Sequence, residues 1–208
     1  VYRRQVRHLV DHAIATIGEP DHGIWEPRAE PQHHVHSKLM TWVAIDRGLQ
    51  LAPLFGGDRE QEGWARAHAR LRAEIEREGY DSDAGTFVGT YGGDAVDSTL
   101  LLLPLYGFLP GDDPRVVRTL ERVRKDLGVG RHLYRYKVDD GIAGEEGAFV
   151  LCGFWLAEAL ALAGRLDEAL EVFSAHASAA NHVGLLAEEV DPTTGAALGN
   201  FPQAFSHL

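Results

Sequence analysis

Two kinds of apolar pattern alternate along this chain, and the alternation restricts the fold more than any other feature. The first kind is one-sided. In "DDPRVVRTLERVRKDLG", Val116, Leu120 and Val123 form one stripe among arginines, after a capping Asp113 and a proline suited to the first helical turn. Three further segments show it, namely 2–17, 58–79 and 166–177. In the last, the predicted core-facing stripe is Leu166, Leu170 and Phe173.

The second kind of segment is apolar on nearly every side. It covers 37–52, 98–109 and 147–164, and another such helix is expected to begin near Phe201. A helix without a polar face is buried all round. Pro104 should kink the short segment 98–109, for which a buried strand is the alternative. Inner and outer helices therefore alternate along the chain.

The connections between these helices are unequal in length. Links from inner to outer helices are short turns, whereas the outer-to-inner links are long, at about 18–36, 79–97, 128–146 and 179–200. If helices alternate in direction, every long link emerges at the same end of the assembly. We therefore predict an all-α fold, an α/α toroid whose functional groups lie on the face built by the long links.

The composition excludes some classes of partner and favours one cellular compartment. The formal net charge of −11 argues against nucleic acid or an anionic membrane as the main partner, and no stretch reaches the length of a membrane span. A single cysteine, Cys152, allows no internal disulfide and fits a cytoplasmic setting. The first residue is Val1 and the last lies within an apolar pattern, so we expect the chain to be a fragment.

The long links gather side chains typical of a carbohydrate site. They carry Trp25 and Glu26, then Arg135, Tyr136 and the pair Glu145–Glu146, then Glu188, Glu189 and Asp191. Aromatic rings stack on the apolar faces of sugars, and charged groups bond to sugar hydroxyls. Two carboxylates on opposite sides of a glycosidic bond are the minimum for its hydrolysis.

Four blocks of sequence resemble the bacterial branch of glycoside hydrolase family 15, which contains glucoamylases, glucodextranases and some trehalases. They are "GIWEPR…HHVHSKLMTWVAIDRGLQLA", "DSTLLLLPLYGFLPGDDPRV", "YRYKVDDGIAGEEGAFVLCGFWLAEALALAGRLDEA" and "GLLAEEVDPTTGAALGNFPQAFSH". The resemblance implies an (α/α)6 catalytic barrel. About eight of its twelve helices are expected here, so 1–208 would be a C-terminal portion, without the first helices and any β-sandwich domain.

The resemblance also implies roles for individual residues. It assigns the general acid of an inverting mechanism to Glu26 and the general base to Glu188, with Glu189 as the alternative base. Arg135 matches a substrate-binding arginine, and Arg28, Glu146 and Trp25 are expected in the binding site. Glu26 must hold a proton until the glycosidic oxygen takes it, with Trp25 expected to shield it from water. Glu188 must be ionised, with donors around it. Inversion predicts about 6.5–9.5 Å between the two carboxyl groups.

The expected activity is exo-acting release of glucose from α-glucans, maltooligosaccharides or trehalose, with no cofactor and no metal. His33, His34 and His36, near Asp21 and His22, match no zinc spacing and are read as loop and pocket wall. "DSDAGTF" and "DPTTG" are predicted turns. The alternatives are a disaccharide phosphorylase on the same barrel, or a non-catalytic helical fragment, inactive or prone to aggregate by itself.

Overall fold

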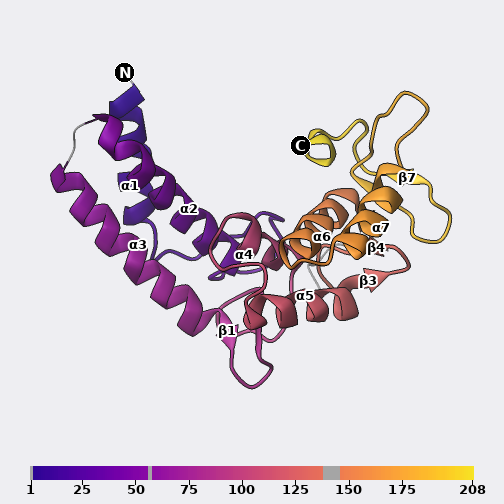
Figure 1. Cartoon of the computed structure of the whole chain (residues 1–208), viewed down its shortest axis with the longest axis horizontal. Helices are drawn as coiled ribbons and strands as arrows, with labels where there is room; N and C mark the ends of the chain where they lie inside the picture. The colour runs from indigo at the N-terminus through magenta and orange to yellow at the C-terminus, as the bar shows by residue number, and fades with distance from the viewer. Residues whose placement is uncertain (1, 56–57, 138–145) are drawn as a thin grey trace. The chain divides into compact units, whose positions relative to one another are not determined.

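The computed structural model describes residues 2–55, 58–137 and 146–208, which form two compact units (Figure 1). Unit 1 runs to Tyr80 and includes Thr90–Gly93. Unit 2 comprises Asp81–Gly89 and Asp94–Leu208. No helix in the described ranges combines the length and the apolar character that a bilayer crossing requires.

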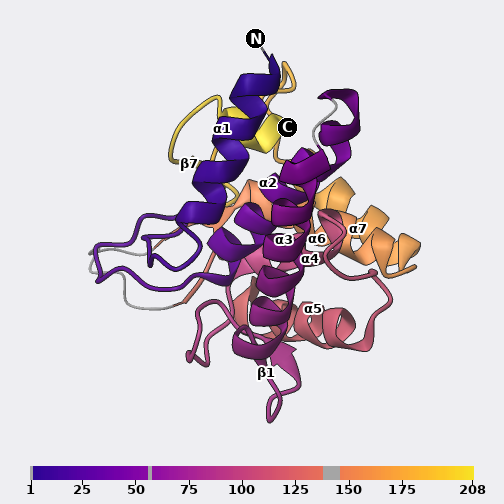
Figure 2. The ribbon, with the colours of Figure 1, turned by 90° about the vertical axis from the view of Figure 1, so that its left-hand side faces the viewer.

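Unit 1 is built from three long helices, seen from one side in Figure 2. They are α1 (Tyr2–Ala15), α2 (Val35–Leu51) and α3 (Asp58–Glu78), with a 3₁₀ turn η1 (Ala52–Phe55) after α2. Helix α2 packs against both α1 and α3. Gly48 permits the close crossing, because a Cβ there would lie 2.5 Å from a methyl of Val10.

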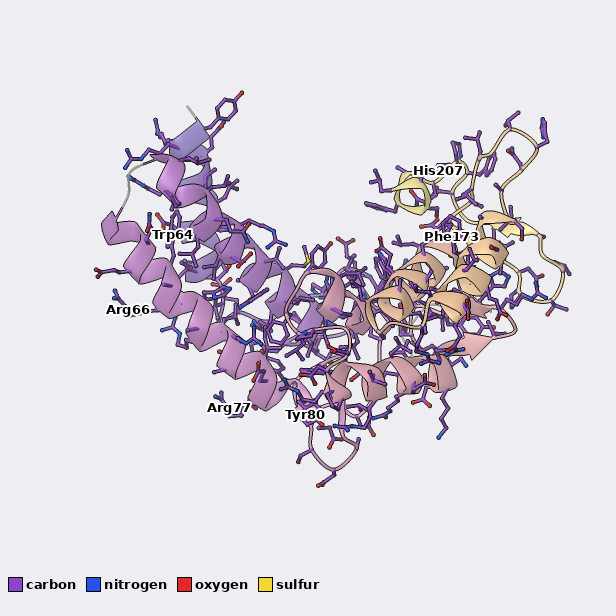
Figure 3. The ribbon with its side chains drawn as sticks, in the orientation of Figure 1. Trp64, Arg66, Arg77, Tyr80, Phe173 and His207 are labelled. Atoms are coloured by element: carbon purple, nitrogen blue, oxygen red, sulfur yellow. The ribbon has the colours of Figure 1, made fainter. Side chains whose placement is uncertain are left out.

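The one-sided pattern of α3 packs as predicted. Trp64, Leu71 and Ile75 are buried, and the indole N–H of Trp64 donates to Asp11 of α1 at 2.9 Å (Figure 3). This bond satisfies a polar atom that would otherwise be costly to bury.

Unit 2 combines helices with very short strands. In chain order the elements are β1 (Tyr80–Asp81, shared with the end of unit 1), β2 (Thr86–Phe87), η2 (Ser98–Leu101), α4 (Leu102–Leu105), α5 (Pro114–Leu127), β3 (Gly128–Val129), β4 (His132–Leu133), β5 (Ala148–Phe149), α6 (Val150–Leu162), α7 (Leu166–Ala177), β6 (Glu189–Val190), β7 (Ala197–Leu198) and η3 (Ala204–His207). Strands β3 and β4 form one antiparallel pair, and β5, β6 and β7 form an antiparallel sheet with β6 in the middle. The sheet positions the last long link beside the start of α6.

Helix α5 follows its sequence signals closely. Asp113 accepts a hydrogen bond from the backbone N–H of Arg115 at 2.8 Å, and Pro114 occupies the first turn. Val116, Leu120 and Val123 are buried. The predicted stripe of this outer helix is therefore confirmed.

The prediction for α7 was right about the helix and wrong about its buried face. Leu166, Leu170 and Phe173 are all more than half exposed, whereas Ala169 and His176 are buried. Phe173 is labelled in Figure 3. The reason lies in α6. Gly153 has no side chain, and the ring of His176 fills that space, so α7 turns its histidine rather than its leucines toward α6.

Two further predictions need correction. Segment 98–109 is neither a full helix nor a strand. It forms the 3₁₀ turn η2 and the single turn α4. Gly107, two residues after the end of α4, has a φ of 75°. The helix expected near Phe201 is only the 3₁₀ turn η3. The described residues thus hold seven α-helices, one of them a single turn, and three 3₁₀ turns.

Candidate active site

The first predicted catalytic residue, Glu26, lies on a loop of residues 21–32, which we call the Glu26 loop. Its two end residues, Asp21 and Gln32, bond to each other, and we call this pair the neck of the loop. Its two ends pair through reciprocal backbone hydrogen bonds between Asp21 and Gln32, at 2.9 and 2.8 Å. Asp21 Oδ1 also accepts from the Gly23 N–H at 2.6 Å and from the Ser37 hydroxyl at 2.7 Å. The loop is therefore tied to the first turn of α2.

Glu26 adopts an unusual backbone conformation. Its φ is 49°, the left-handed region, and it is the one non-glycine residue with positive φ in the described ranges. Pro27 follows it, and a residue before proline ordinarily favours extended backbone. Such a conformation costs about 1–3 kcal/mol and persists where its surroundings hold it, often at functional sites.

The side chains of the Glu26 loop are more open than predicted. Glu26 and Arg28 are exposed, and Trp25 is half-buried. The expected shielding of Glu26 by Trp25 is thus not found in the part of the chain that the structure describes.

Two histidines that follow this loop pack against neighbouring residues. The ring of His34 lies against Gly23, where an added Cβ would meet the ring at 3.1 Å, and His33 stacks with Tyr91 at 5.8 Å between ring centroids. Burial lowers the pKa of His36 to about 4, although the charge of Asp21 opposes the shift. Within the described residues, no three His, Cys, Asp or Glu side chains are placed to hold a metal ion.

The second predicted catalytic residue, Glu188, is surrounded by N–H donors. Its Oε2 accepts from both the backbone N–H and the Nδ2 of Asn200 at 2.9 Å, and its Oε1 accepts from Nε2 of Gln203 at 3.2 Å. Gly199 leaves room for this carboxylate, because a Cβ there would lie 2.7 Å from Oε2. Glu188 is half-buried, so it has the donors and the partial solvent access expected of a general base.

Glu189, the alternative base, has a different environment. As part of β6 it pairs with Phe149, and its Oε2 accepts from the Gly147 N–H at 2.9 Å. Burial raises the pKa of Glu189, and the negative charges of Glu146 and Glu188 raise it further, against the opposing hydrogen bond from Gly147. A carboxylate fixed on a backbone amide suits a structural role.

The predicted binding residues Arg135 and Glu146 are in contact. The Arg135 guanidinium forms an ion pair with Glu146, and it lies 4.8 and 4.9 Å from the ring centroids of Tyr136 and Phe149. Its side chain is only 14% exposed, so the cation is held rigidly between the rings. Glu145, the other member of the predicted pair, lies outside the described residues.

Unit 2 thus brings together Arg135, Glu146, Glu188 and Glu189, while Trp25, Glu26 and Arg28 lie in unit 1. Four supporting residues were missed from sequence. Asn200 and Gln203 bond to Glu188, and Asp21 and Ser37 secure the Glu26 loop. The signal available for Asn200 and Gln203 was the motif "GNFPQ". It begins at Gly199, ten residues after Glu189, and the pairing of β6 with β7 brings the two segments together.

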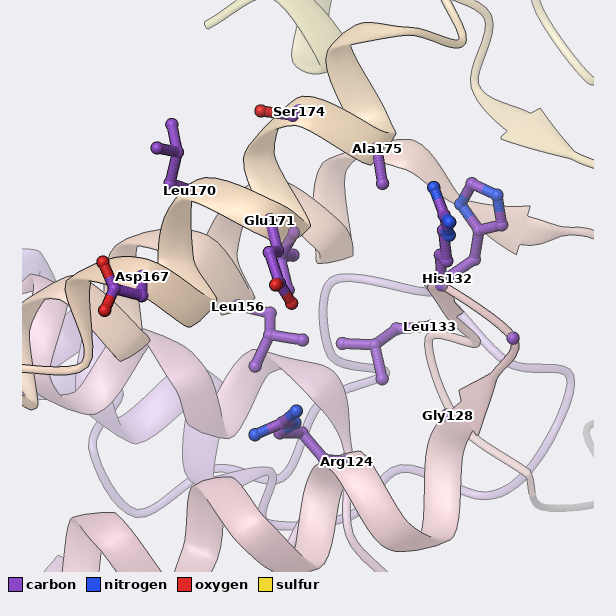
Figure 4. A pocket seen from close by; sticks show the side chains of 13 residues that line it. Arg124, Gly128, His132, Leu133, Leu156, Asp167, Leu170, Glu171, Ser174 and Ala175 are labelled. Carbon is purple, nitrogen blue, oxygen red and sulfur yellow. The ribbon is translucent and has the colours of Figure 1, made fainter.

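A separate cavity of about 890 Å³ lies between α5, α7 and the β3–β4 turn (Figure 4). Its lining includes Arg124, His132, Asp167 and Glu171, and none of the six predicted site residues. Nδ1 of the lining residue His132 lies 3.2 Å from Nε2 of the fully buried His176. Burial lowers the pKa of both histidines.

The predictions about the remaining polar motifs hold. "DSDAGTF" and "DPTTG" are turns, in which Asp81 and Asp191 accept from the second and third following N–H groups. Cys152 is fully buried, 3.0 Å from the Ser98 hydroxyl, and burial raises its pKa, so it is packed and unreactive.

Comparison with known proteins agrees with this reading of the fold. The chain is 44% identical to the trehalase of Mycolicibacterium smegmatis over 206 residues, which cover 98% of this chain and 31% of that protein. A solved wild-type glycosidase superposes with a TM-score of 0.81 at 26% identity, covering 95% of this chain and 55% of its own. A bacterial glucoamylase complexed with acarbose superposes with a TM-score of 0.77 at 18% identity, over 97% and 36% of the two chains, which shows the fold alone.

These likenesses confirm the predicted class, an all-α fold with helices of an (α/α)6 toroid. The chain spans about a third of the length of the trehalase that it matches. The family profile described as Glycosyl hydrolases family 15 matches residues 1–208. The chain therefore belongs to glycosyl hydrolase family 15.

Proposed function

We propose that this chain contributes the catalytic acid and base of an inverting, exo-acting α-glucoside hydrolase, with trehalose as the first substrate to test. The observation that carries the proposal is the 44% identity to a trehalase over nearly the whole chain. The alternative substrates are α-glucans and maltooligosaccharides, because the chain shares its fold with a bacterial glucoamylase.

In the proposed reaction, Glu26 donates its proton to the glycosidic oxygen as the bond from that oxygen to the anomeric carbon breaks. A water molecule attacks the anomeric carbon from the opposite face, and Glu188 takes a proton from that water. The products from trehalose are one β-glucose and one α-glucose. The left-handed backbone of Glu26 supports its role, because strained residues are frequent at active sites.

Two features support Glu188 rather than Glu189 as the base. N–H groups of Asn200 and Gln203 surround the Glu188 carboxylate and orient it. The carboxylate of Glu189 is instead fixed on the Gly147 amide.

We assign substrate binding to the half-buried Arg135–Glu146 pair and, from the Glu26 loop, to Trp25 and Arg28. An arginine held between two rings loses little freedom on bonding to a sugar hydroxyl. We further propose that both units belong to one catalytic barrel, and that the protein works in the cytoplasm on a free saccharide, without nucleic acid or membrane partners. The buried thiol of Cys152 is compatible with that compartment.

The test is glucose release from trehalose by the protein and by Glu26→Gln and Glu188→Gln. Each substitution is expected to lower kcat by about 10²–10⁴-fold, the usual contribution of acid–base groups. Glu30→Gln, an exposed carboxylate of the same loop, is the control and should keep full activity. Wild-type turnover in either catalytic variant would refute the assignment.

Two further arms separate the alternatives. A Glu189→Gln variant that loses as much activity as Glu188→Gln would transfer the role of base to Glu189. Turnover that requires inorganic phosphate and yields glucose phosphate would indicate a phosphorylase. Absence of turnover on every α-glucoside would favour a non-catalytic helical protein.

A further inference from the structure

We propose that Asp21 is a positioning residue that holds the Glu26 loop in its working conformation. The inference rests on the function proposed above, because it takes Glu26 as the proton donor. Asp21 does not touch the substrate in this scheme. It acts through the backbone that carries Glu26.

Asp21 is the point at which the Glu26 loop closes. Its backbone N–H and C=O both bond to Gln32, at the other end of the loop. Its carboxylate then bonds inward, to the N–H of Gly23, and fixes the first turn of the loop, where Gly23 has a φ of 64°. One residue therefore sets both the neck and the first turn.

The same carboxylate connects the loop to the core of unit 1. Oδ1 accepts from the hydroxyl of Ser37, in the first turn of α2. The next residue, Lys38, is 2% exposed and donates to the carbonyls of Ile17 and Glu19, just before the loop. Two consecutive side chains of one helix thus hold the chain where it enters the loop.

This connection matters because Glu26 is strained. A glutamate before proline has little reason to adopt a φ of 49° unless both ends of its loop are fixed. Within the described ranges, no hydrogen bond holds the Glu26 carboxylate itself, so its position follows from the backbone. Removing the Asp21 carboxylate would release the first turn of the loop from its bonds to Gly23 and Ser37. The backbone of Glu26 should then relax to negative φ and carry its carboxyl group away from the glycosidic oxygen.

Two substrates distinguish loss of proton donation from general damage. Trehalose needs a proton on its leaving oxygen. α-Glucosyl fluoride does not, because the C1–F bond breaks to release fluoride while water adds at C1 and gives its proton to Glu188. Asp21→Ala is expected to lower turnover of trehalose by about 10²-fold, the effect of displacing a catalytic group by about 1 Å. Turnover of the fluoride should change by less than about tenfold, because it does not use the acid.

Conservative and control variants make the test specific. Asp21→Asn keeps an acceptor oxygen and should recover most of the trehalose activity, and Ser37→Ala should show a weaker loss of the same kind. Asp81→Ala is the matched control, because Asp81 makes the same type of turn bonds in unit 2 and should not alter the ratio of the two activities. Circular dichroism and thermal unfolding establish that each variant is folded.

A double variant completes the test. In a Glu26→Gln background, Asp21→Ala should have no further effect on trehalose, because the group that it positions is already lost. Equal losses on both substrates, an unchanged ratio in Asp21→Ala, or multiplying losses in the double variant would overturn this inference alone. A wild-type protein that hydrolyses neither substrate would overturn the proposed function, and this inference with it.

Discussion

Asn200 donates two hydrogen bonds to one oxygen of Glu188, from its backbone N–H and from its side-chain Nδ2, both at 2.9 Å. The Glu188 backbone N–H in turn donates to the Asn200 carbonyl at 3.0 Å. These bonds fix the carboxylate that we propose as the base, and they leave its second oxygen with a single longer bond, from Gln203.

Replacing Asn200 by alanine should therefore impair turnover without unfolding the protein. A hydrogen bond to a charged group is worth about 1.5–3 kcal/mol, so we expect kcat on trehalose to fall at least about tenfold. Asn200 is exposed and its backbone N–H bond remains, so the free energy of unfolding should fall by no more than about 1.5–3 kcal/mol. Asn181 is an exposed asparagine of another turn, and the kcat of Asn181→Ala is the value for comparison. An unchanged kcat in Asn200→Ala would show that this donor does not orient a base.

Arg135→Lys should weaken substrate binding. The planar guanidinium lies over the rings of Tyr136 and Phe149 and pairs with Glu146, which the compact ammonium of lysine cannot reproduce. We expect KM for trehalose to rise about tenfold or more, with a smaller effect on kcat. Arg131→Lys, the same substitution at an exposed arginine, serves as the control and should leave KM unchanged. Equal KM values for Arg135→Lys and wild type would remove Arg135 from the binding site.

Gly153→Ala should destabilise unit 2. The added methyl would lie 1.9 Å from Nε2 of His176, so α6 and α7 would have to separate. Overpacking of this kind costs about 1–3 kcal/mol, measurable by urea unfolding. Gly18→Ala, where the new methyl meets nothing within 4 Å, should leave stability nearly unchanged. Equal stability of the two variants would show that α7 is not packed through His176.

His36 should make stability depend on pH in a defined window. Burial lowers its pKa from 6.5 to about 4 in the folded state, so between these values the unfolded chain binds more protons. The contribution of His36 to the free energy of unfolding should thus be fully present above about pH 6.5 and should decrease as the pH falls toward 4. The slope should be shallower in His36→Gln than in wild type or in the exposed His8→Gln. Parallel slopes in urea unfolding at pH 7, 6 and 5 would contradict this.

Much of the fold could be predicted because its signals are local. Asp113, Pro114 and a stripe with helical spacing define α5 without any knowledge of its neighbours. The buried face of α7 could not be predicted in this way. The choice of His176 over Leu166 and Phe173 depends on the space above Gly153, which belongs to another helix.

The site shows the same limit. The Trp-Glu and Glu-Glu motifs mark Glu26 and Glu188 in the sequence, but the residues that orient them are distant along the chain or look ordinary. Pro27 favours an extended backbone at Glu26, yet the φ of Glu26 is 49°. The loop that carries Glu26 is closed by the bonds between Asp21 and Gln32, which the local pattern does not reveal. Such closure is visible only once the ends of the loop are placed.

The stereochemistry of the first glucose released from trehalose tests the proposed pairing of acid and base most directly. Proton NMR of early product should show α- and β-glucose in equal amounts, because water inverts the attacked ring and the departing ring keeps its α configuration. Release of α-glucose alone, before mutarotation, would mean retention and would contradict the assignment of Glu26 and Glu188 to opposite faces of the bond.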